Sequence, residues 1–159
     1  MILLFGGWWL VKVVSPNQSD FPVAAIYALT GVAAAENYHS VRGVRFGAEE
    51  VNRRGGVLDR KMTLIEIDNR STPIGSKVAA DKAVEAGVVA ILGADWSSHS
   101  LAIARVAQAH GIPMISNIST HPKVTQVGDC IFRTCFTDQF AGRVMARFAR
   151  QTLWLETAV

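Results

Sequence analysis

The stretch VAAIYALTG, residues 23–31, decides the fold of this chain. Its run from Val23 to Leu29 is apolar throughout and lacks the alternation that marks a half-exposed strand. Thr30-Gly31 then ends the run with a turn. The stretch is typical of a strand in the middle of a parallel sheet that helices cover on both faces.

Outward from this strand, segments with helical and extended patterns alternate along the chain. The first helix ends at Gly55-Gly56, and its apolar positions fall at helical spacing: Val41, Val44, Ala48 and Val51. The elements predicted after it are strands at 61–68, 88–92, 113–116 and 130–135, and helices at 73–86, at 98–109 and from Asp138 onward. Thr72 and Asp138 are the predicted N-caps of the second and last helices.

Right-handed connections between parallel strands give such a series the doubly wound order 2-1-3-4-5. The predicted fold class is therefore α/β, a single Rossmann-like lobe with helices on both faces of its sheet. Ligands bind such sheets beyond the carboxyl ends of the strands, where the chain reverses its winding direction. Here that point lies between the first and third strands, and the candidate loops are 30–40, 93–98 and 116–122.

Residues 1–20 read as an apolar leader ahead of a lobe at 21–159. The run MILLFGGWWLVKVV, residues 1–14, has the length of a signal-peptide core and is short for a membrane span. It lacks a preceding basic segment and a small-residue cleavage site, so an aberrant or non-native leader is the alternative. We expect a periplasmic or extracytoplasmic location, with anchoring through the leader as one variant.

The charge pattern argues against a nucleic-acid partner. The chain has 16 Lys and Arg against 13 Asp and Glu, a formal net charge of +3. The basic residues are scattered over helix faces and loops, whereas a nucleic-acid interface needs a basic patch or stripe.

Neither catalysis nor a cofactor finds support in the sequence. Glycine-rich loops of the G-x-G-x-x-G or G-x-x-x-x-G-K-[ST] type do not occur. Asp95, Ser97 and His99 lie too close along the chain to converge as a hydrolytic triad. The histidines lie on separate loops and helix ends, which favours surface or helix-terminal roles over metal ligation: His39, His99, His110 and His121. Cys130 and Cys135 share an extended segment and are predicted to be two buried thiols, without a disulfide.

The loop after the third strand offers a place for a small carboxylate. Ser97 and Ser98 fall where a helix begins, so hydroxyls and free backbone N–H groups point outward together. The helix dipole adds about 0.3–1 kcal/mol for an anion there. The alternative is that one serine caps its own helix. Trp96 beside them is either a wall for a ligand side chain or a lid over the core.

The loop after the fourth strand, residues 116–122, offers a complementary place for an ammonium group. Thr120 can donate or accept, and backbone carbonyls are available nearby. The alternative is a simple turn ending in Pro122.

Several segments together, in their order and spacing, resemble the amino-terminal lobe of branched-chain amino-acid-type substrate-binding proteins of ABC transporters, which have the periplasmic binding protein type I fold. The resemblance covers about residues 23–159. Its landmarks are YALTG at 27–31, Arg42-Gly43, EVNRRGGVL at 50–58, Asp68-Asn69 with Pro73, ILG at 91–93 with Ser97-Ser98, GIPMIS at 111–116 with Thr120 and Pro122, and FRT at 132–134.

The resemblance implies a protein that closes two lobes over a ligand and delivers it to a membrane permease, without performing chemistry. By position, Ser97 would bind the α-carboxylate of the ligand, Thr120 its carboxylate and ammonium, and the carbonyl of Ile118 its ammonium. Ser98 and Ser119 are expected to assist because they lie beside these residues.

The resemblance leaves the side chain of the ligand open. Glu36 occupies the spacing of an aromatic contact in the family, and Tyr38 lies two residues on. Asp95 and Trp96 replace an apolar-and-cysteine pair, and Ser71 replaces the partner cysteine, so the disulfide of the best-known members is absent. The ligand could be Leu, Ile or Val, another amino acid, an aromatic acid or a short amide.

Thr157-Ala158-Val159 reads as the start of a further strand, which indicates a fragment truncated before the second lobe. The expected partners are an amino acid or similar carboxylate, ABC permease subunits for the full-length protein, and further copies of the fragment through an exposed apolar patch. A ligand-sensing receptor domain of the same fold is the alternative function, and an enzyme of flavodoxin-like fold is a third.

Overall fold

The computed structural model describes residues 20–157, so most of the predicted leader lies outside the described residues. In chain order the elements are β1 (Phe21–Tyr27), α1 (Ala34–Arg53), β2 (Met62–Asp68), α2 (Pro73–Glu85), β3 (Ala90–Gly93), α3 (Ser97–Ala109), β4 (Met114–Ser116), the 3-10 turn η1 (Pro122–Val124), β5 (Ile131–Arg133), α4 (Asp138–Arg147) and the π-helical turn η2 (Phe148–Thr152). Each predicted strand and helix within residues 20–157 is present, with ends shifted by a few residues.

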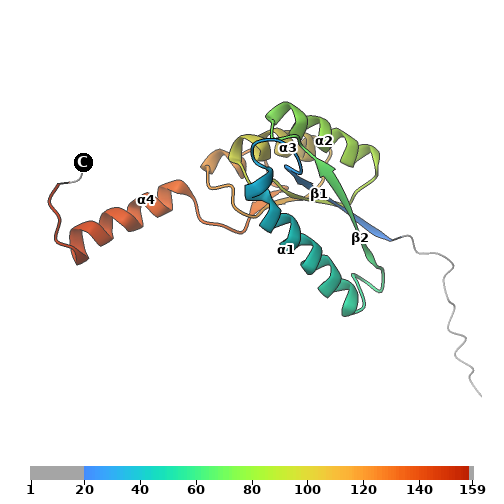
Figure 1. Ribbon diagram of the computed structural model, residues 1–159, viewed down its shortest axis with the longest axis horizontal. Coiled ribbons are helices and arrows are strands. Elements are labelled where there is room, and N and C mark those ends of the chain that lie inside the picture. Colours follow the sequence, from blue (N-terminus) through green and yellow to red (C-terminus); the bar gives the residue numbers. More distant parts are fainter. Residues whose placement is uncertain (1–19, 158–159) are drawn as a thin grey trace, which may run out of the picture.

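The five strands form one parallel sheet in the order β2-β1-β3-β4-β5. This order confirms the predicted doubly wound topology, with β1 in the interior of the sheet (Figure 1). In register, Tyr27 of β1 lies opposite Asp68, and Ile26 lies opposite Gly93. The carboxyl ends of β1, β2 and β3 therefore meet at one edge of the sheet.

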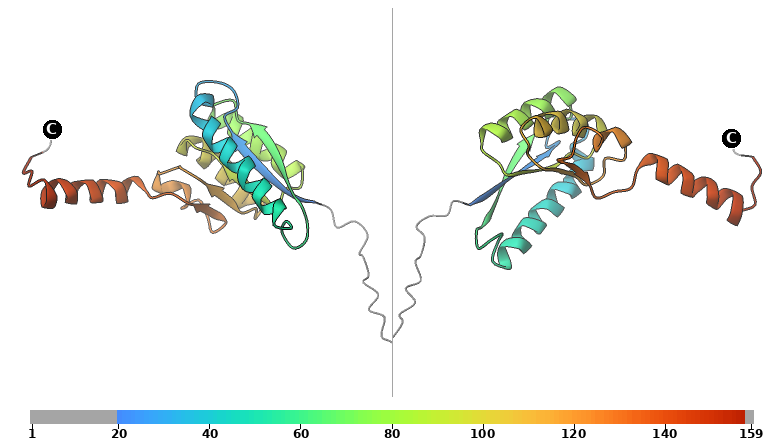
Figure 2. Two further views of the ribbon diagram at one scale, coloured as in Figure 1. Left: turned by 60° about the horizontal axis from the view of Figure 1, so that its bottom comes forward. Right: turned by 180° about the vertical axis from the view of Figure 1, so that it is seen from behind.

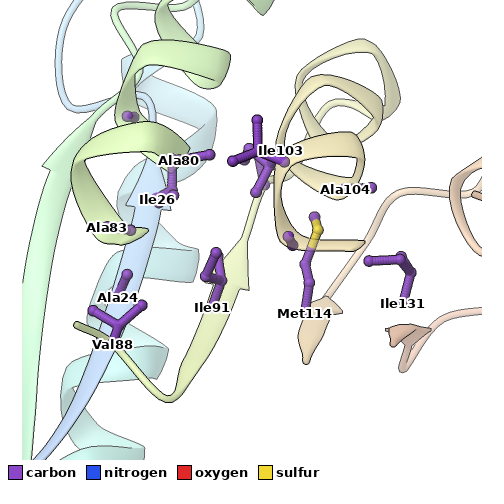
Figure 3. Close-up of a cluster of buried hydrophobic side chains, with 14 of the residues drawn as sticks. Ala24, Ile26, Ala80, Ala83, Val88, Ile91, Ile103, Ala104, Met114 and Ile131 are labelled. Atoms are coloured by element: carbon purple, nitrogen blue, oxygen red, sulfur yellow. The ribbon is translucent and has the colours of Figure 1, made fainter. Parts of the chain in front are cut away.

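Helices α2 and α3 cover one face of the sheet and bury the larger part of the core. Ile26, Ile91 and Met114 point from three neighbouring strands toward Ala80 and Ile103 on these helices (Figure 3). All five side chains are fully buried. Burial of each large aliphatic side chain contributes about 1.5–3 kcal/mol to folding.

Helix α1 lies on the opposite face (Figure 2), and its main contacts with the sheet are with β1 and β2. Val41 of α1 packs there against Ala25 and Tyr27. Beyond the reach of α1, Ile115 of β4 is 40% exposed and Phe132 of β5 is 50% exposed. These neighbouring residues, Ile115 and Phe132, are paired in register and form what we call the bare β4–β5 face.

The start of α2 follows the prediction. The Thr72 hydroxyl accepts a hydrogen bond from the N–H of Gly75 at 2.9 Å, and Pro73 takes the first helical position. Gly87, with φ of 68°, follows the end of the helix.

Helix α4 projects away from the sheet on an extended connection (Figures 1 and 2). Its N-cap is Thr137, whose hydroxyl accepts from the N–H of Phe140 at 3.3 Å, so the prediction of Asp138 as N-cap was wrong by one residue. No residue of α4 is buried within the described chain. The apolar side of this helix continues into η2, and what we call the α4 stripe consists of Phe140, Ala141, Val144 and Met145 of α4 and Phe148 of η2.

The final predicted strand is not seen at Thr157, and Ala158-Val159 lie outside the described residues. Cys130 and Cys135 are free, as predicted, but half-buried instead of buried. No helix within residues 20–157 is long and apolar enough to cross a membrane.

Candidate functional site

Gly93 ends β3 at the point where the sheet reverses its winding direction, and it fixes how closely the following loop approaches β1. Its φ is 126°, which side chains rarely tolerate. A Cβ atom at this position would lie 2.1 Å from the carbonyl oxygen of Ile26. The loop 94–96 therefore leaves the sheet directly against the neighbouring strand.

The Asp95 carboxylate ties this loop to two other elements. Its Oδ1 accepts from Asn117 Nδ2 and its Oδ2 from the Ser40 hydroxyl, both at 2.8 Å. The Tyr27 hydroxyl in turn donates to Asn117 Oδ1 at 3.3 Å. The side chains of Tyr27, Ser40, Asp95 and Asn117 thus form one network, the Asp95 network, that joins β1, α1 and the loops after β3 and β4.

Burial raises the pKa of Asp95 above the ordinary aspartate range, although the hydrogen bonds from Asn117 and Ser40 offset part of this effect and the charge of Glu36 adds to it. Burial, followed by the charge of Asp95, likewise raises the pKa of Tyr27. Asp95 is therefore a buried carboxylic acid whose hydrogen-bond donors, Ser40 and Asn117, carry no charge.

Three buried serines join the loops 93–98 and 116–122, which we call the two hydroxyl loops. The hydroxyls of Ser100, Ser116 and Ser119 each donate to the carbonyl oxygen of Ala94, at 2.9 to 3.1 Å. Ser119 also lies 2.9 Å from the carbonyl oxygen of Asp95. Ser119, predicted to assist in ligand binding, is fully buried, so its hydroxyl serves contacts inside the lobe.

Ser97 and Ser98 form the first turn of α3. The N-cap is Trp96 and no side chain caps the helix, so neither serine caps its own helix as the alternative interpretation supposed. Within residues 20–157 the N–H groups of Ser97 and Ser98 have no hydrogen-bond acceptor. The Ser97 hydroxyl accepts from the N–H of His121 at 3.3 Å, which brings the second loop alongside the first.

Ile118 and Thr120 lie on that second loop. Ile118 is exposed and Thr120 is half-buried. Neither the carbonyl oxygen of Ile118 nor the hydroxyl of Thr120 is hydrogen-bonded to any residue of the described chain. The carbonyl of Thr120 accepts from the N–H of Asp138 at 3.0 Å.

Arg133, at the end of β5, braces the second loop from beneath. Its guanidinium donates to the carbonyl oxygens of Ser119 at 2.8 Å, His121 at 3.1 Å and Pro122 at 3.0 Å. It also donates to the Thr125 hydroxyl at 2.8 Å. Sequence reasoning treated Arg133 only as a landmark, since nothing local to FRT indicates carbonyls more than eight residues away.

Trp96 takes the second of its predicted roles, a cover over the core, and its role as a wall for a ligand side chain stays a prediction. Its indole packs against His99, with ring centroids 5.3 Å apart, and so covers part of the interior. Its Nε1 donates to Glu36 Oε2 at 2.7 Å. His99 is itself buried, contrary to the expectation of a surface histidine, and its Nδ1 lies 3.5 Å from Asn69 Nδ2.

Tyr38 lies apart from this group. Its ring contacts His39 edge-on at 5.4 Å, and the guanidinium of Arg42 lies 5.6 Å from its centre. With Leu29 and Arg45 it lines a separate hollow of about 240 Å³.

Asp95, Ser97 and His99 do not form a hydrolytic triad. Asp95 bonds to Ser40 and Asn117, and the Ser97 hydroxyl bonds to the N–H of His121. In the part of the chain that the structure describes, no three His, Cys, Asp or Glu side chains are grouped for a metal ion.

A family profile described as periplasmic binding protein matches residues 20–154. The chain belongs to the periplasmic binding protein family. The match includes the whole sheet, both hydroxyl loops and α4.

Curated relatives of this periplasmic binding protein include a Leu/Ile/Val-binding protein, BraC3, from Rhizobium johnstonii and a leucine-specific-binding protein from Salmonella typhimurium. The first is 28% identical over 82% of this chain and 36% of the relative. The second is 29% identical over 84% of this chain and 37% of the relative. The chain thus spans little more than a third of the length of these relatives.

Solved structures give the same result for the fold. A leucine binding protein from Thermotoga maritima is 35% identical, with a TM-score of 0.75 over 84% of this chain and 37% of its own. LivJ from Streptococcus pneumoniae, solved in complex with isoleucine, is 23% identical with a TM-score of 0.79, over 85% of this chain and 39% of its own. The relatives are described as binding proteins, not as enzymes.

Proposed function

We propose that residues 21–159 form the first lobe of an extracytoplasmic solute-binding protein, and that this lobe supplies one wall of a site for an amino acid or similar small carboxylate. In the complete protein the ligand would pass to the permease subunits of an ABC importer. The observation that carries the proposal is the proximity of free donors at the start of α3 to free acceptors on the second loop, within a member of this family.

The carboxylate of the ligand would bind at the start of α3. The N–H groups of Ser97 and Ser98 have no acceptor within residues 20–157, and the Ser97 hydroxyl still has its proton to donate. Donors of this kind, aligned with the helix dipole, favour an anion by about 0.3–1 kcal/mol at an exposed position.

The ammonium of the ligand would bind on the second loop. The carbonyl of Ile118 and the hydroxyl of Thr120 are acceptors without a donor in the described chain. Because His121 bonds to Ser97, these acceptors lie next to the start of α3. An α-amino acid carries its ammonium and carboxylate on one carbon, and adjoining acceptors and donors suit that geometry.

The Asp95 network and Arg133 would hold this arrangement in place before a ligand arrives. Asp95 fixes the first loop to Asn117 on the second, and Arg133 fixes three carbonyls of the second loop. Preformed loops reduce the entropy lost on binding.

A single lobe should bind weakly, because it covers one side of a small ligand and leaves the other side in water.

The chain on its own should also pair with a second copy of itself. The α4 stripe and the bare β4–β5 face are both exposed, and each is the kind of apolar surface that the other could cover. Each copy carries one α4 stripe and one bare β4–β5 face, so two copies can each cover the apolar surfaces of the other.

The binding proposal can be tested on the chain itself by NMR titration with amino acids at millimolar concentrations. Shifts of the Ser97 and Ser98 amide signals that saturate with ligand would support it. The double variant Ser97→Ala, Thr120→Ala should weaken binding about fivefold or more, since each lost hydrogen bond contributes roughly 0.5–1.5 kcal/mol. Thr63→Ala, at the opposite edge of the sheet, is the control. Equal binding by double variant and wild type would refute the site.

A further inference from the structure

We infer that the pair Glu36–Trp96 selects a ligand whose side chain carries a hydrogen-bond donor, in preference to a branched aliphatic one. The inference rests on the proposed function, because it concerns the side-chain end of the same site. It begins from the bond between Trp96 Nε1 and Glu36 Oε2, at 2.7 Å.

This bond places a carboxylate beside the serines. Trp96 directly precedes Ser97, which begins α3, whereas Glu36 lies in the first turn of α1. The indole N–H therefore holds the Glu36 side chain at the border of the proposed site, where we place the side chain of the ligand.

The two oxygens of the Glu36 carboxylate differ in their hydrogen bonds. Oε2 accepts from the indole, whereas Oε1 accepts from no residue within 20–157. Glu36 also makes no ion pair in the described chain: Arg45, on the same helix, pairs with Glu66, and Arg42 lies over the ring of Tyr38. The carboxylate is thus exposed, oriented and without a cationic partner.

A carboxylate in this state disfavours an aliphatic side chain against it, since burying an acceptor without a donor costs free energy. A hydroxyl, amide or ammonium on the ligand would instead donate to Oε1 in a charge-assisted hydrogen bond. The indole beside Glu36 provides apolar contact for the stem of such a side chain.

The test compares ligands of matched shape on the 159-residue chain: threonine with valine, asparagine with leucine, and tyrosine with phenylalanine. Members of each pair share the α-carboxylate and α-ammonium, so their difference reports the side chain alone. Binding is followed by NMR at the amides of Ser97 and Ser98 and at the indole N–H of Trp96, whose signal is assigned with Trp96→Phe.

The donor-bearing member of each pair should bind about two- to tenfold more tightly and should shift the indole signal. Glu36→Leu should abolish this preference, Glu36→Gln should keep part of it, and Glu49→Leu, on the exposed side of α1, should leave it unchanged.

The outcomes separate the two proposals. Binding at Ser97 and Ser98 with the aliphatic members equal or tighter overturns the inference and leaves the proposed function standing. An unchanged preference in Glu36→Leu also overturns it. The absence of any ligand-dependent shift at Ser97 and Ser98 overturns the proposed function and the inference with it.

Discussion

The carboxylate of Asp95 lies 2.8 Å from Nδ2 of Asn117, and this bond joins the loops that follow β3 and β4. The two loops carry all the groups proposed to meet the polar end of a ligand. Their relative position is therefore set by a buried acid, which is 3% exposed, and not by the serines alone.

The titration of Asp95 should be visible in the stability of the lobe. Burial raises its pKa, so the folded state holds the proton more tightly than the unfolded chain does. Its contribution is then fully present below the ordinary aspartate pKa of about 3.9 and is lost as the pH rises through the raised value. Relative to Asp95→Asn, which does not titrate, the wild type should lose stability over that interval in urea unfolding.

Asp68 provides the opposite case as a control. Burial acts to raise its pKa, but hydrogen bonds from Thr30, Arg70 and Leu29 outweigh that effect and lower it. Stability relative to Asp68→Asn should therefore fall as the pH drops through the lowered pKa. Slopes of the same sign for both variants would contradict the assignment.

Substitution of Gly93 should be severe. In Gly93→Ala the new Cβ would lie 2.1 Å from the Ile26 carbonyl oxygen, at a backbone angle that alanine rarely adopts. We expect a loss of roughly 3 kcal/mol or more, or failure to fold. Gly111→Ala is the matched control, because its φ is 65° and nothing lies within 4 Å, and it should cost only about 1–2 kcal/mol. Equal losses would show that the approach of β3 to β1 is looser than described.

The core between the sheet and α3 should be sensitive to truncation. Ile103 is fully buried among Ile91 and Met114, so Ile103→Ala should cost about 2–5 kcal/mol in urea unfolding. Ile74 is 79% exposed, and Ile74→Ala should stay within about 0.5 kcal/mol of wild type. A small loss of stability in Ile103→Ala would mean that the surrounding side chains move in and fill the cavity.

Self-association should depend on the α4 stripe. The wild-type chain is expected to give dimers or larger species in light scattering, because Phe140 and Val144 are exposed on one side of α4. The double variant Phe140→Ser, Val144→Ser should shift the population toward monomer. Arg143→Ser, which alters the same helix but not the stripe, should not. A monomeric wild type at high protein concentration would refute pairing through α4.

The order of the strands followed from the sequence because it depends on local signals. Apolar runs, glycines and the Thr72-Pro73 cap each act over a few residues, and right-handed connections then leave few topologies. The misplaced cap at α4 has a local cause as well: Thr137 and Asp138 are both good N-caps, and only the backbone shows which one accepts the bond.

The Asp95 network could not be predicted in the same way. Tyr27 and Asn117 are 90 residues apart in the chain, and no pattern near either one specifies the hydrogen bond between them. The bond between Glu36 and Trp96 spans 60 residues and was missed for the same reason. Side-chain pairs of this kind arise from how the elements pack, so a sequence indicates the loops but not the bonds that lock them.

The shortness of β5 affects how copies of this chain can meet. An outer strand normally presents a row of free backbone donors and acceptors that a foreign strand can extend. β5 contains only Ile131–Arg133, so that border of the sheet offers little template for such growth. The self-association proposed above would then rest on the side chains of the α4 stripe and the bare β4–β5 face, and not on backbone pairing at β5.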